Sequence, residues 1–280
     1  AFMQWASEQV MCHQIVQFIF PSRDGFLFYR IAKQMQRHGA FPGVEICYIK
    51  ASRRAYAVAS VFTVEDLRKA LAYLPQFPTN EELLKGCFRL VPESEDKRLR
   101  ERPDWAGQTF ACLERYATQI LEESAWERNN LQKYLYSQSL TNPKNAAIFD
   151  FAAKGTVQYY LEKQLKRQLL GLYCATMSHP NELFPESGHV LSAFGNITPY
   201  GGDSILSCVY LSLEALLVDG DGTLEYFDEA GQPVIQSTRD FSYRQQLSIQ
   251  ESIIGFVEQY LCLWEETPIK PQETEIFLNV

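Results

Sequence analysis

The stretch QFIFPSRDGFLFYRIAKQM, residues 17–35, predicts an α/β fold, because an apolar strand runs through a short polar loop directly into a helix. In an open parallel sheet such a loop lies at the carboxyl end of its strand, at the edge where ligands bind. The helix that follows directs unpaired backbone N–H groups and a partial positive charge at that edge. The loop Ser22-Arg23-Asp24-Gly25 is therefore a candidate anion site, the alternative being a surface pair of Arg23 with Asp24.

The residues that follow complete a strand–helix–strand unit. The segment FLFYRIAKQMQRHG has helical spacing and stops at Gly39, a plausible C-cap. The next segment, VEICYIKASRRA, predicts a strand that ends in a second polar loop with Arg53 and Arg54. Residues 15–55 thus predict a βαβ unit with a polar loop at the carboxyl end of each strand, although the two arginines could also form a solvated corner.

From about residue 63 the pattern becomes helical. Thr63 and Thr79 are typical helix N-cap residues, and Thr79 has the capping-box spacing to Glu82. The stretch PESEDKRLRERPD is a solvated charge run, and residues 104–140 are strongly helical.

A third polar loop follows the next predicted strand, within NAAIFDFAAKGTVQYYLEKQLKRQLLGLYCAT, residues 145–176. We expect Asp150 to end that strand and Lys154-Gly155-Thr156 to open the following helix. Glycine permits close backbone approach, threonine offers a hydroxyl, and lysine supplies charge, so the three together could cradle a phosphate. The alternative is an ordinary βα turn. Further on, the sequence predicts a helix near 204–217 and a hairpin in TLEYFDEAGQPVI that turns near Ala230-Gly231.

These patterns predict an α/β protein with a parallel-sheet core and a large helical insertion. We expect the core in residues 1–62 and 141–280, the latter with a C-terminal hairpin and helix, and the insertion in residues 63–140.

The composition is that of an ordinary globular protein, with 46% hydrophobic and 21% charged residues in 280. The net charge of −8 argues against nucleic-acid binding, which needs a basic face. Seven cysteines without paired or metal-ligand spacing indicate a reducing compartment, and no apolar run is long enough to span a bilayer. The chain begins inside an apparent helix, FMQWASEQVMCHQ, as expected of a fragment of a longer protein.

The segment LLVDGDGTLEYF suggests a different chemistry. Asp219 and Asp221 resemble the nucleophile and acid/base of haloacid-dehalogenase-type phosphatases. The residues after Thr223 lack the further lysine and acidic loops that such an enzyme needs, so we interpret the segment as an acidic, glycine-rich surface turn.

The order of the loops resembles a known family. The PSRDG, ASRRA and FDFAAKGTVQ loops, with Glu214 in LSLEALL, are similar to a domain of bacterial capsule and O-antigen synthesis proteins that accompanies haloacid-dehalogenase-type phosphatases. The resemblance extends from the first helix to about residue 235. It implies a variant of the type I phosphoribosyltransferase fold that moves ribose 5-phosphate from phosphoribosyl pyrophosphate to a sugar hydroxyl of a lipid-linked glycan. A phosphatase domain or protein then removes the 5-phosphate.

The resemblance also implies roles for the loop residues. Lys154, Gly155 and Thr156 would hold the 5-phosphate, and Asp150 would contact the ribose hydroxyls. Ser22 to Gly25, with Arg53 and Arg54, would hold pyrophosphate and its Mg²⁺. Glu214 matches a glutamate of the family pattern that we count among the substrate-binding residues. The resemblance also implies a cytoplasmic protein, which could be peripheral at the inner face of the membrane.

The sequence departs from the family pattern at one point that bears on mechanism. Asp150 is followed by Phe151 where two adjacent acids are typical, and the loop is about one residue shorter, so the metal ligands stay open. Loss of pyrophosphate leaves an oxocarbenium-like ribosyl centre that a carboxylate must shelter while arginine and metal neutralise the leaving group. We expect Asp150, Asp24 and Arg23 to be catalytic, with Asp24 and Asp150 as candidate general bases. Two other hypotheses remain: the phosphatase, and a non-catalytic glycan- or nucleotide-binding module.

Overall fold

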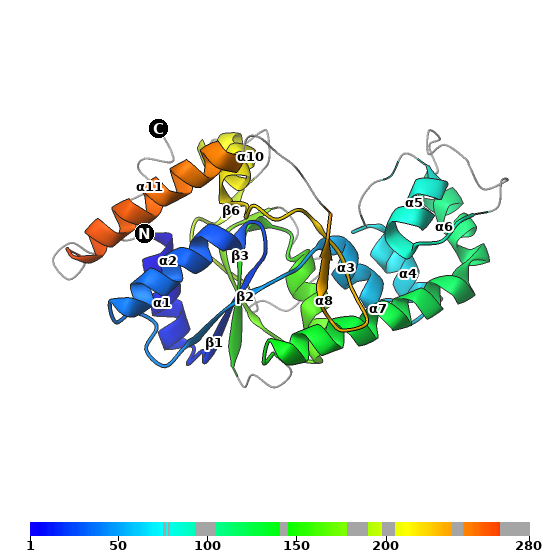
Figure 1. Cartoon of the computed structure of the whole chain (residues 1–280), viewed down its shortest axis with the longest axis horizontal. Helices are drawn as coiled ribbons and strands as arrows, with labels where there is room; N and C mark the ends of the chain where they lie inside the picture. Colours follow the sequence, from blue (N-terminus) through cyan, green and yellow to red (C-terminus); the bar gives the residue numbers. More distant parts are fainter. Residues whose placement is uncertain are drawn as a thin grey trace.

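The computed structural model of the chain describes residues 1–74, 77, 79–92, 105–140, 145–177, 190–197, 205–236 and 243–263. Figure 1 shows a central sheet with helices on both sides and a further group of helices beside it. The elements in chain order are α1 (Phe2–Cys12), β1 (Gln17–Pro21), α2 (Gly25–Arg37), β2 (Glu45–Ile49), α3 (Arg53–Ala59), α4 (Val64–Leu71), α5 (Asn80–Phe88), α6 (Trp105–Arg115), α7 (Ala117–Ser137), β3 (Ala146–Ala153), α8 (Thr156–Leu165), β4 (Leu170–Met177), β5 (Val190–Ser192), β6 (Asn196–Ile197), α10 (Ile205–Leu217), β7 (Leu224–Phe227), β8 (Pro233–Ile235) and α11 (Tyr243–Leu261).

The main sheet contains five parallel strands in the order β2-β1-β3-β4-β5, with β6 pairing to β4 beside β5. β1 is an internal strand that pairs with β2 on one side and with β3 on the other. The α/β class with a parallel sheet and the βαβ unit of residues 15–55 are therefore confirmed. The order of the strands reverses direction between β1 and β3, and in doubly wound sheets this switch point is where ligands bind.

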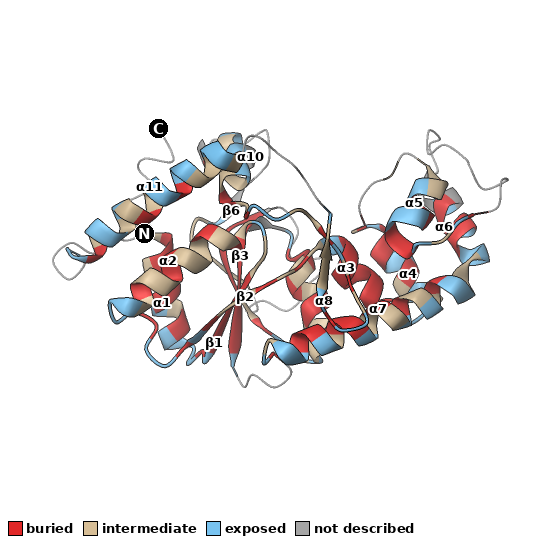
Figure 2. Ribbon diagram, in the orientation of Figure 1, coloured by how far each residue is buried: buried red, intermediate tan, exposed pale blue. Residues whose placement is uncertain are grey.

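The two faces of the sheet bury different side chains, because successive residues of a strand point to opposite faces. Phe18 and Phe20 of β1 pack with Phe149 of β3 in one apolar cluster. Ile19 and Ile148, from the same two strands, belong to a second cluster. The strands are thus buried on both sides, as Figure 2 shows, which explains their nearly continuous apolar sequence.

Helices cover each face. α1, α2, α10 and α11 contribute to the cluster with Phe18 and Phe20, and α3, α7 and α8 contribute to the cluster with Ile19. α2 begins tightly against β1, because a Cβ on Gly25 would lie 3.2 Å from the carbonyl carbon of Phe20. That close approach is a packing reason for glycine at this position.

The described residues between 63 and 140 form α4, α5, α6 and α7. Thr63 is the N-cap of α4 in a reciprocal capping box with Asp66, and the hydroxyl of Thr79 accepts a hydrogen bond from the N–H of Glu82 at the start of α5. Both predicted N-caps are confirmed. The buried leucines of these helices, such as Leu67, belong to the same cluster as Ile19 of the sheet, and α7 connects the group to α3 (Figure 1). The division of the chain into domains stays a prediction.

The predicted hairpin is confirmed in β7 and β8, which pair antiparallel. Gly231 takes a φ of 77°, the left-handed conformation that the turn requires and glycine adopts without strain. Asn130 of α7 donates a hydrogen bond to the carbonyl of Phe227, so the hairpin is fastened to the helical layer.

All seven cysteines carry free thiols. Within the described part of the chain, no helix has the length and apolar character needed to cross a bilayer.

Candidate functional site

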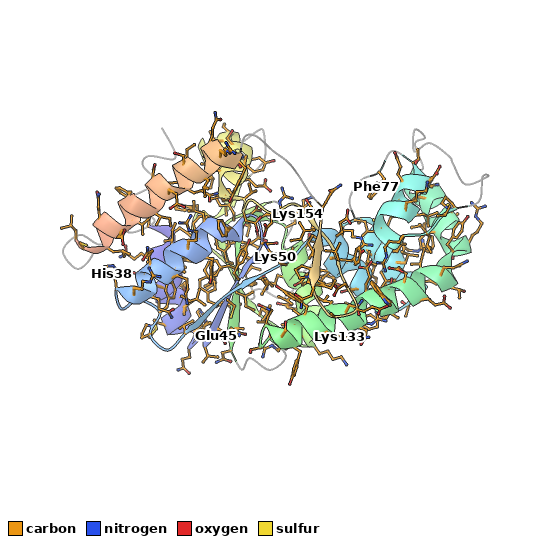
Figure 3. The ribbon with its side chains drawn as sticks, viewed as in Figure 1. His38, Glu45, Lys50, Phe77, Lys133 and Lys154 are labelled. Atoms are coloured by element: carbon orange, nitrogen blue, oxygen red, sulfur yellow. The ribbon has the colours of Figure 1, made fainter. Side chains whose placement is uncertain are left out.

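Three polar loops lie at the carboxyl edge of the sheet, as the sequence predicts. They follow β1, β2 and β3, which are neighbours in the sheet. In Figure 3, Lys50 after β2 and Lys154 after β3 lie on the side of α10, whereas Glu45 at the start of β2 lies at the opposite edge. Because parallel strands point the same way, residues 22–25, 50–54 and 150–156 share one edge.

Three carboxylates and one arginine meet at this edge from four separate elements. Asp24 precedes α2, Asp150 lies in β3, Glu214 lies on α10 and Arg53 begins α3. The charges of Glu214 and Arg53 act on both aspartates, and Asp24 acts on Asp150. The structure thus brings together four of the residues that we expected to share a site.

The two aspartates have strongly perturbed acidities. Burial, followed by the nearby charge of Glu214, raises the pKa of Asp24 to about 7, against the opposing charges of Arg23 and Arg53. Burial and the charge of Asp24 raise the pKa of Asp150 to about 7, although its Oδ1 accepts a 2.8 Å hydrogen bond from the N–H of Phe151. Perturbed carboxyl groups at a ligand-binding edge are typical of functional sites.

Asp150 lies inside its strand instead of at the end. We expected the strand to stop there, but β3 continues to Ala153, and Asp150 is in register with Tyr173 of β4. The pairing of β3 with β4 extends past Asp150 through Ala153, so the neighbouring strand supports three more extended residues.

Ser22 has a structural role at the edge. Its hydroxyl donates to the carbonyl of Ala51 and accepts from the N–H of the same residue, both at 3.0 Å, and its own N–H donates to Ile49. This hydroxyl joins the loop after β1 to the loop after β2. Binding of pyrophosphate by Ser22 stays a prediction.

Arg23 is exposed and has a φ of 70°, a conformation that is uncommon for residues other than glycine. Strained residues of this kind cost about 1–3 kcal/mol and cluster at functional sites. The conformation lets the chain turn from β1 into α2 within three residues, and it leaves the guanidinium of Arg23 near Asp24.

The Lys154-Gly155-Thr156 segment opens α8, as predicted. Gly155 is the N-cap, with a φ of 80° that favours glycine. Thr156 is the first helical residue and is buried, whereas Lys154 is exposed. The arrangement leaves the unpaired N–H groups of a ten-residue helix at the edge, next to a lysine.

Arg54 does not lie with these residues, and the interior position of its side chain disagrees with its expected role in holding pyrophosphate. Its guanidinium is buried, contacts both carboxylate oxygens of Glu127 at 2.6–2.7 Å, and donates to the carbonyls of Gly86, Cys87 and Glu225. Since all these partners are internal, Arg54 fastens α3 to α5, α7 and β7. We leave it out of the candidate site.

Asp219 is the residue whose place we predicted wrongly. It lies in a turn between α10 and β7, but its side chain is buried, with 6% exposed. Its Oδ2 accepts hydrogen bonds from the hydroxyl of Tyr48 and from Lys50 Nζ, the latter at 2.9 Å. Its charge also acts on Asp24, so Asp219 is a fourth carboxylate near the edge. The glycine-rich sequence gave no signal of this burial, which comes from contact with β2.

The surroundings of Asp219 and Asp221 argue against the phosphatase hypothesis. Asp219 follows α10 and precedes the antiparallel β7, so it does not follow a strand of the parallel sheet. Both aspartates are instead paired with Lys50.

The fold and the site define an α/β protein with a five-stranded parallel sheet, flanked by helices, and a cluster of perturbed carboxyl groups at its carboxyl edge. No protein-family model matches the chain, and comparison with curated proteins finds no match.

Proposed function

We propose that this protein is a glycan phosphoribosyltransferase with a type I phosphoribosyltransferase-like core. It would move ribose 5-phosphate from phosphoribosyl pyrophosphate to a sugar hydroxyl of a growing, lipid-linked bacterial polysaccharide. The observation that carries the proposal is the convergence of Asp24, Asp150, Glu214 and Arg53 at the switch point of the sheet. A separate phosphatase would then remove the 5-phosphate from the product.

Two helix N-termini support a substrate with phosphates at both ends. α8 begins at Gly155 with its left-handed backbone, and α2 begins beside Asp24. Such N-termini bind phosphate through unpaired N–H groups and the helix dipole. Lys154 and the start of α8 would hold the 5-phosphate, while Arg23 and Arg53 would hold the diphosphate on the other side of the switch point.

The reaction needs charges of both signs close together. The bond from the ribosyl anomeric carbon to the diphosphate oxygen breaks, a bond to the acceptor oxygen forms, and the acceptor hydroxyl loses a proton. Arg23 and Arg53 would neutralise the leaving diphosphate. Asp24 or Asp150 would accept the proton, and a pKa near 7 suits a general base at neutral pH.

Mg²⁺ fits this site only together with the substrate. Among the described residues, no group of three or more histidine, cysteine, aspartate or glutamate side chains is arranged to hold a metal ion. Mg²⁺ commonly binds through one or two carboxylates together with substrate phosphates and water, and Asp24 and Asp150 offer such carboxylates. When bound, the ion would neutralise diphosphate charge.

The proposal predicts stabilisation by the donor substrate. Millimolar phosphoribosyl pyrophosphate with Mg²⁺ should raise the melting temperature, because a ligand that binds only the folded state stabilises it. Ribose 5-phosphate should raise it less, since it lacks the diphosphate. The measurement is a thermal unfolding scan, with MgCl₂ alone as control. An unchanged melting temperature would favour a binding module for another ligand.

The two exposed arginines should matter for turnover more than for binding. Negative charge on the diphosphate grows in the transition state, so Arg23→Ala and Arg53→Ala should each lower kcat at least about tenfold, or about 1.4 kcal/mol of barrier. Transfer to an authentic acceptor glycan is the assay, and Arg37→Ala, an exposed arginine at the far end of α2, is the control. Normal turnover by both variants would mean that the loops are structural.

A further inference from the structure

Hydrogen bonds hold the backbone of Lys50 in place at the carboxyl edge of the sheet. It follows β2 directly and lies three residues before Arg53. Its backbone N–H donates a 2.6 Å hydrogen bond to the hydroxyl of Tyr134, and its carbonyl accepts one of 3.2 Å from Tyr56. Two tyrosines from the helical layer therefore fix the backbone from which this side chain extends.

The ammonium group of Lys50 is bound by two aspartates of the turn between α10 and β7. Nζ lies 2.9 Å from Oδ2 of Asp219 and 2.5 Å from Oδ2 of Asp221, and it approaches the ring of Tyr48 at 5.2 Å. Burial acts to lower the pKa of Lys50, but the two carboxylates outweigh it and the pKa is raised. Lys50 is thus a protonated lysine at the carboxyl edge. Within the described part of the chain, it forms ion pairs with Asp219 and Asp221.

The two carboxylates differ in how firmly they are placed. Asp219 has 5% of its side chain exposed and is also fixed by the hydroxyl of Tyr48, whereas Asp221 has 56% exposed. An exposed lysine–carboxylate pair contributes little free energy, because water and salt screen it. The contact with Asp219 is therefore the permanent one, and the contact with Asp221 is easily exchanged.

The turn that carries Asp221 does not depend on Lys50 for its conformation. A Cβ on Gly222 would lie 1.5 Å from the carbonyl oxygen of Gln236, so this backbone is packed closely on the end of the hairpin. The N–H of Gln236 donates to the carbonyl of Thr223 at 2.9 Å. Replacing Asp221 should therefore remove its charge without moving the turn.

We propose that Lys50 is an anion-binding residue of the site and that Asp221 competes with the diphosphate group for its ammonium. The inference rests on the proposed function, because it takes the anion to be the diphosphate of the donor or the released pyrophosphate. A diphosphate held by Arg53 brings several negative charges to the same loop, and it replaces Asp221 while Asp219 keeps Lys50 in place. Asp221 thereby weakens product binding and favours release of pyrophosphate.

The competition predicts opposite effects of two substitutions. Lys50→Met should weaken binding of inorganic pyrophosphate at least about tenfold, since it removes a charge-assisted contact. Asp221→Asn should tighten binding about two- to fivefold, the range that an exposed ion pair is worth. If Lys50 only fastens the turn to β2, neither change in affinity is expected, although both variants would lose some thermal stability.

The test is titration calorimetry of the intact chain with inorganic pyrophosphate at low ionic strength. Lys133→Met and Glu229→Gln are matched controls, because they change the same charges on α7 and the hairpin, and Lys133 lies away from the edge (Figure 3). If both test variants bind pyrophosphate with wild-type affinity, this inference fails but the proposed function does not. Weaker pyrophosphate binding by Asp221→Asn would also overturn this inference. That measurement remains informative even if Lys50→Met does not fold. If the wild type binds neither pyrophosphate nor phosphoribosyl pyrophosphate, both this inference and the proposed function fail.

Discussion

Replacing Asp150 with asparagine is expected to stabilise the protein at pH 8 and to lower its transfer rate at least about a hundredfold. The rate loss follows because a carboxylate that shelters the ribosyl cation or accepts the acceptor proton contributes about two orders of magnitude or more. Asparagine keeps the shape of the side chain and can accept the same hydrogen bond from Phe151 through its Oδ1. Loss of activity together with a gain in stability is the signature of a strained functional group.

The stability effect has a definite pH dependence. The pKa of Asp150 is about 7 in the folded protein and 3.8 in a model compound, so the folded state binds the proton more tightly than the unfolded chain does. The contribution of Asp150 to stability is thus fully present below about pH 4 and is lost as the pH rises through 7. Asparagine at position 150 does not ionise, so the variant does not lose this stability as the pH rises. The melting temperature should therefore rise at least about 2 °C at pH 8, and the gain should shrink by more than half at pH 5.

Thermal unfolding at pH 5 and pH 8, with kcat at pH 8, measures both effects. Glu122→Gln, which changes an exposed carboxylate on α7, is the control and should alter neither quantity. A lower melting temperature of Asp150→Asn at pH 8 would mean that the charged form of Asp150 is stabilised, contrary to the burial of its carboxyl group. A stability gain with full activity would mean that Asp150, which is half-buried, has a raised pKa but is not catalytic.

Arg54→Ala is expected to destabilise the protein by about 3–5 kcal/mol, although the neighbouring Arg53→Ala should change stability by no more than about 0.5 kcal/mol. Removing the guanidinium of Arg54 leaves the buried carboxylate of Glu127 without its cation and takes one hydrogen-bond donor away from each of three carbonyl oxygens. Arg53 is exposed, so its loss leaves no buried group unpaired. Substitution of Arg54 should therefore lower stability, whereas substitution of the adjacent Arg53 should lower turnover.

Urea unfolding measures this difference through the midpoint at constant slope. Burial raises the pKa of Glu127 to about 7 even with Arg54 opposite it, so without the arginine the carboxyl group should take up a proton. The double variant Arg54→Met with Glu127→Leu should accordingly recover much of the stability that Arg54→Ala loses, because no buried charge remains. Additive losses in the double variant would contradict the assignment of the pair.

Much of the fold follows from local sequence. The βαβ unit, the caps at Thr63 and Thr79 and the turn at Gly231 were predictable, because each depends on residues within a few positions of one another. The polar loops at the strand ends were predictable for the same reason. Parallel pairing then brings them to one edge of the sheet. Glu214 was found through the resemblance alone, since nothing in its own helix marks it.

Local patterns in the amino-acid sequence were therefore enough to predict the parallel α/β sheet, the helical segments and the loops that carry Asp24, Arg53 and Asp150. Which side chains of those loops face the edge depends on packing between distant elements and could not be predicted from local patterns. Arg53 and Arg54 are adjacent and chemically alike, yet one is exposed and the other is buried against Glu127, because neighbouring positions of a helix point in different directions. The pKa values near 7 likewise arise from burial and from charges more than a hundred residues apart in the chain, which come together only when the sheet forms.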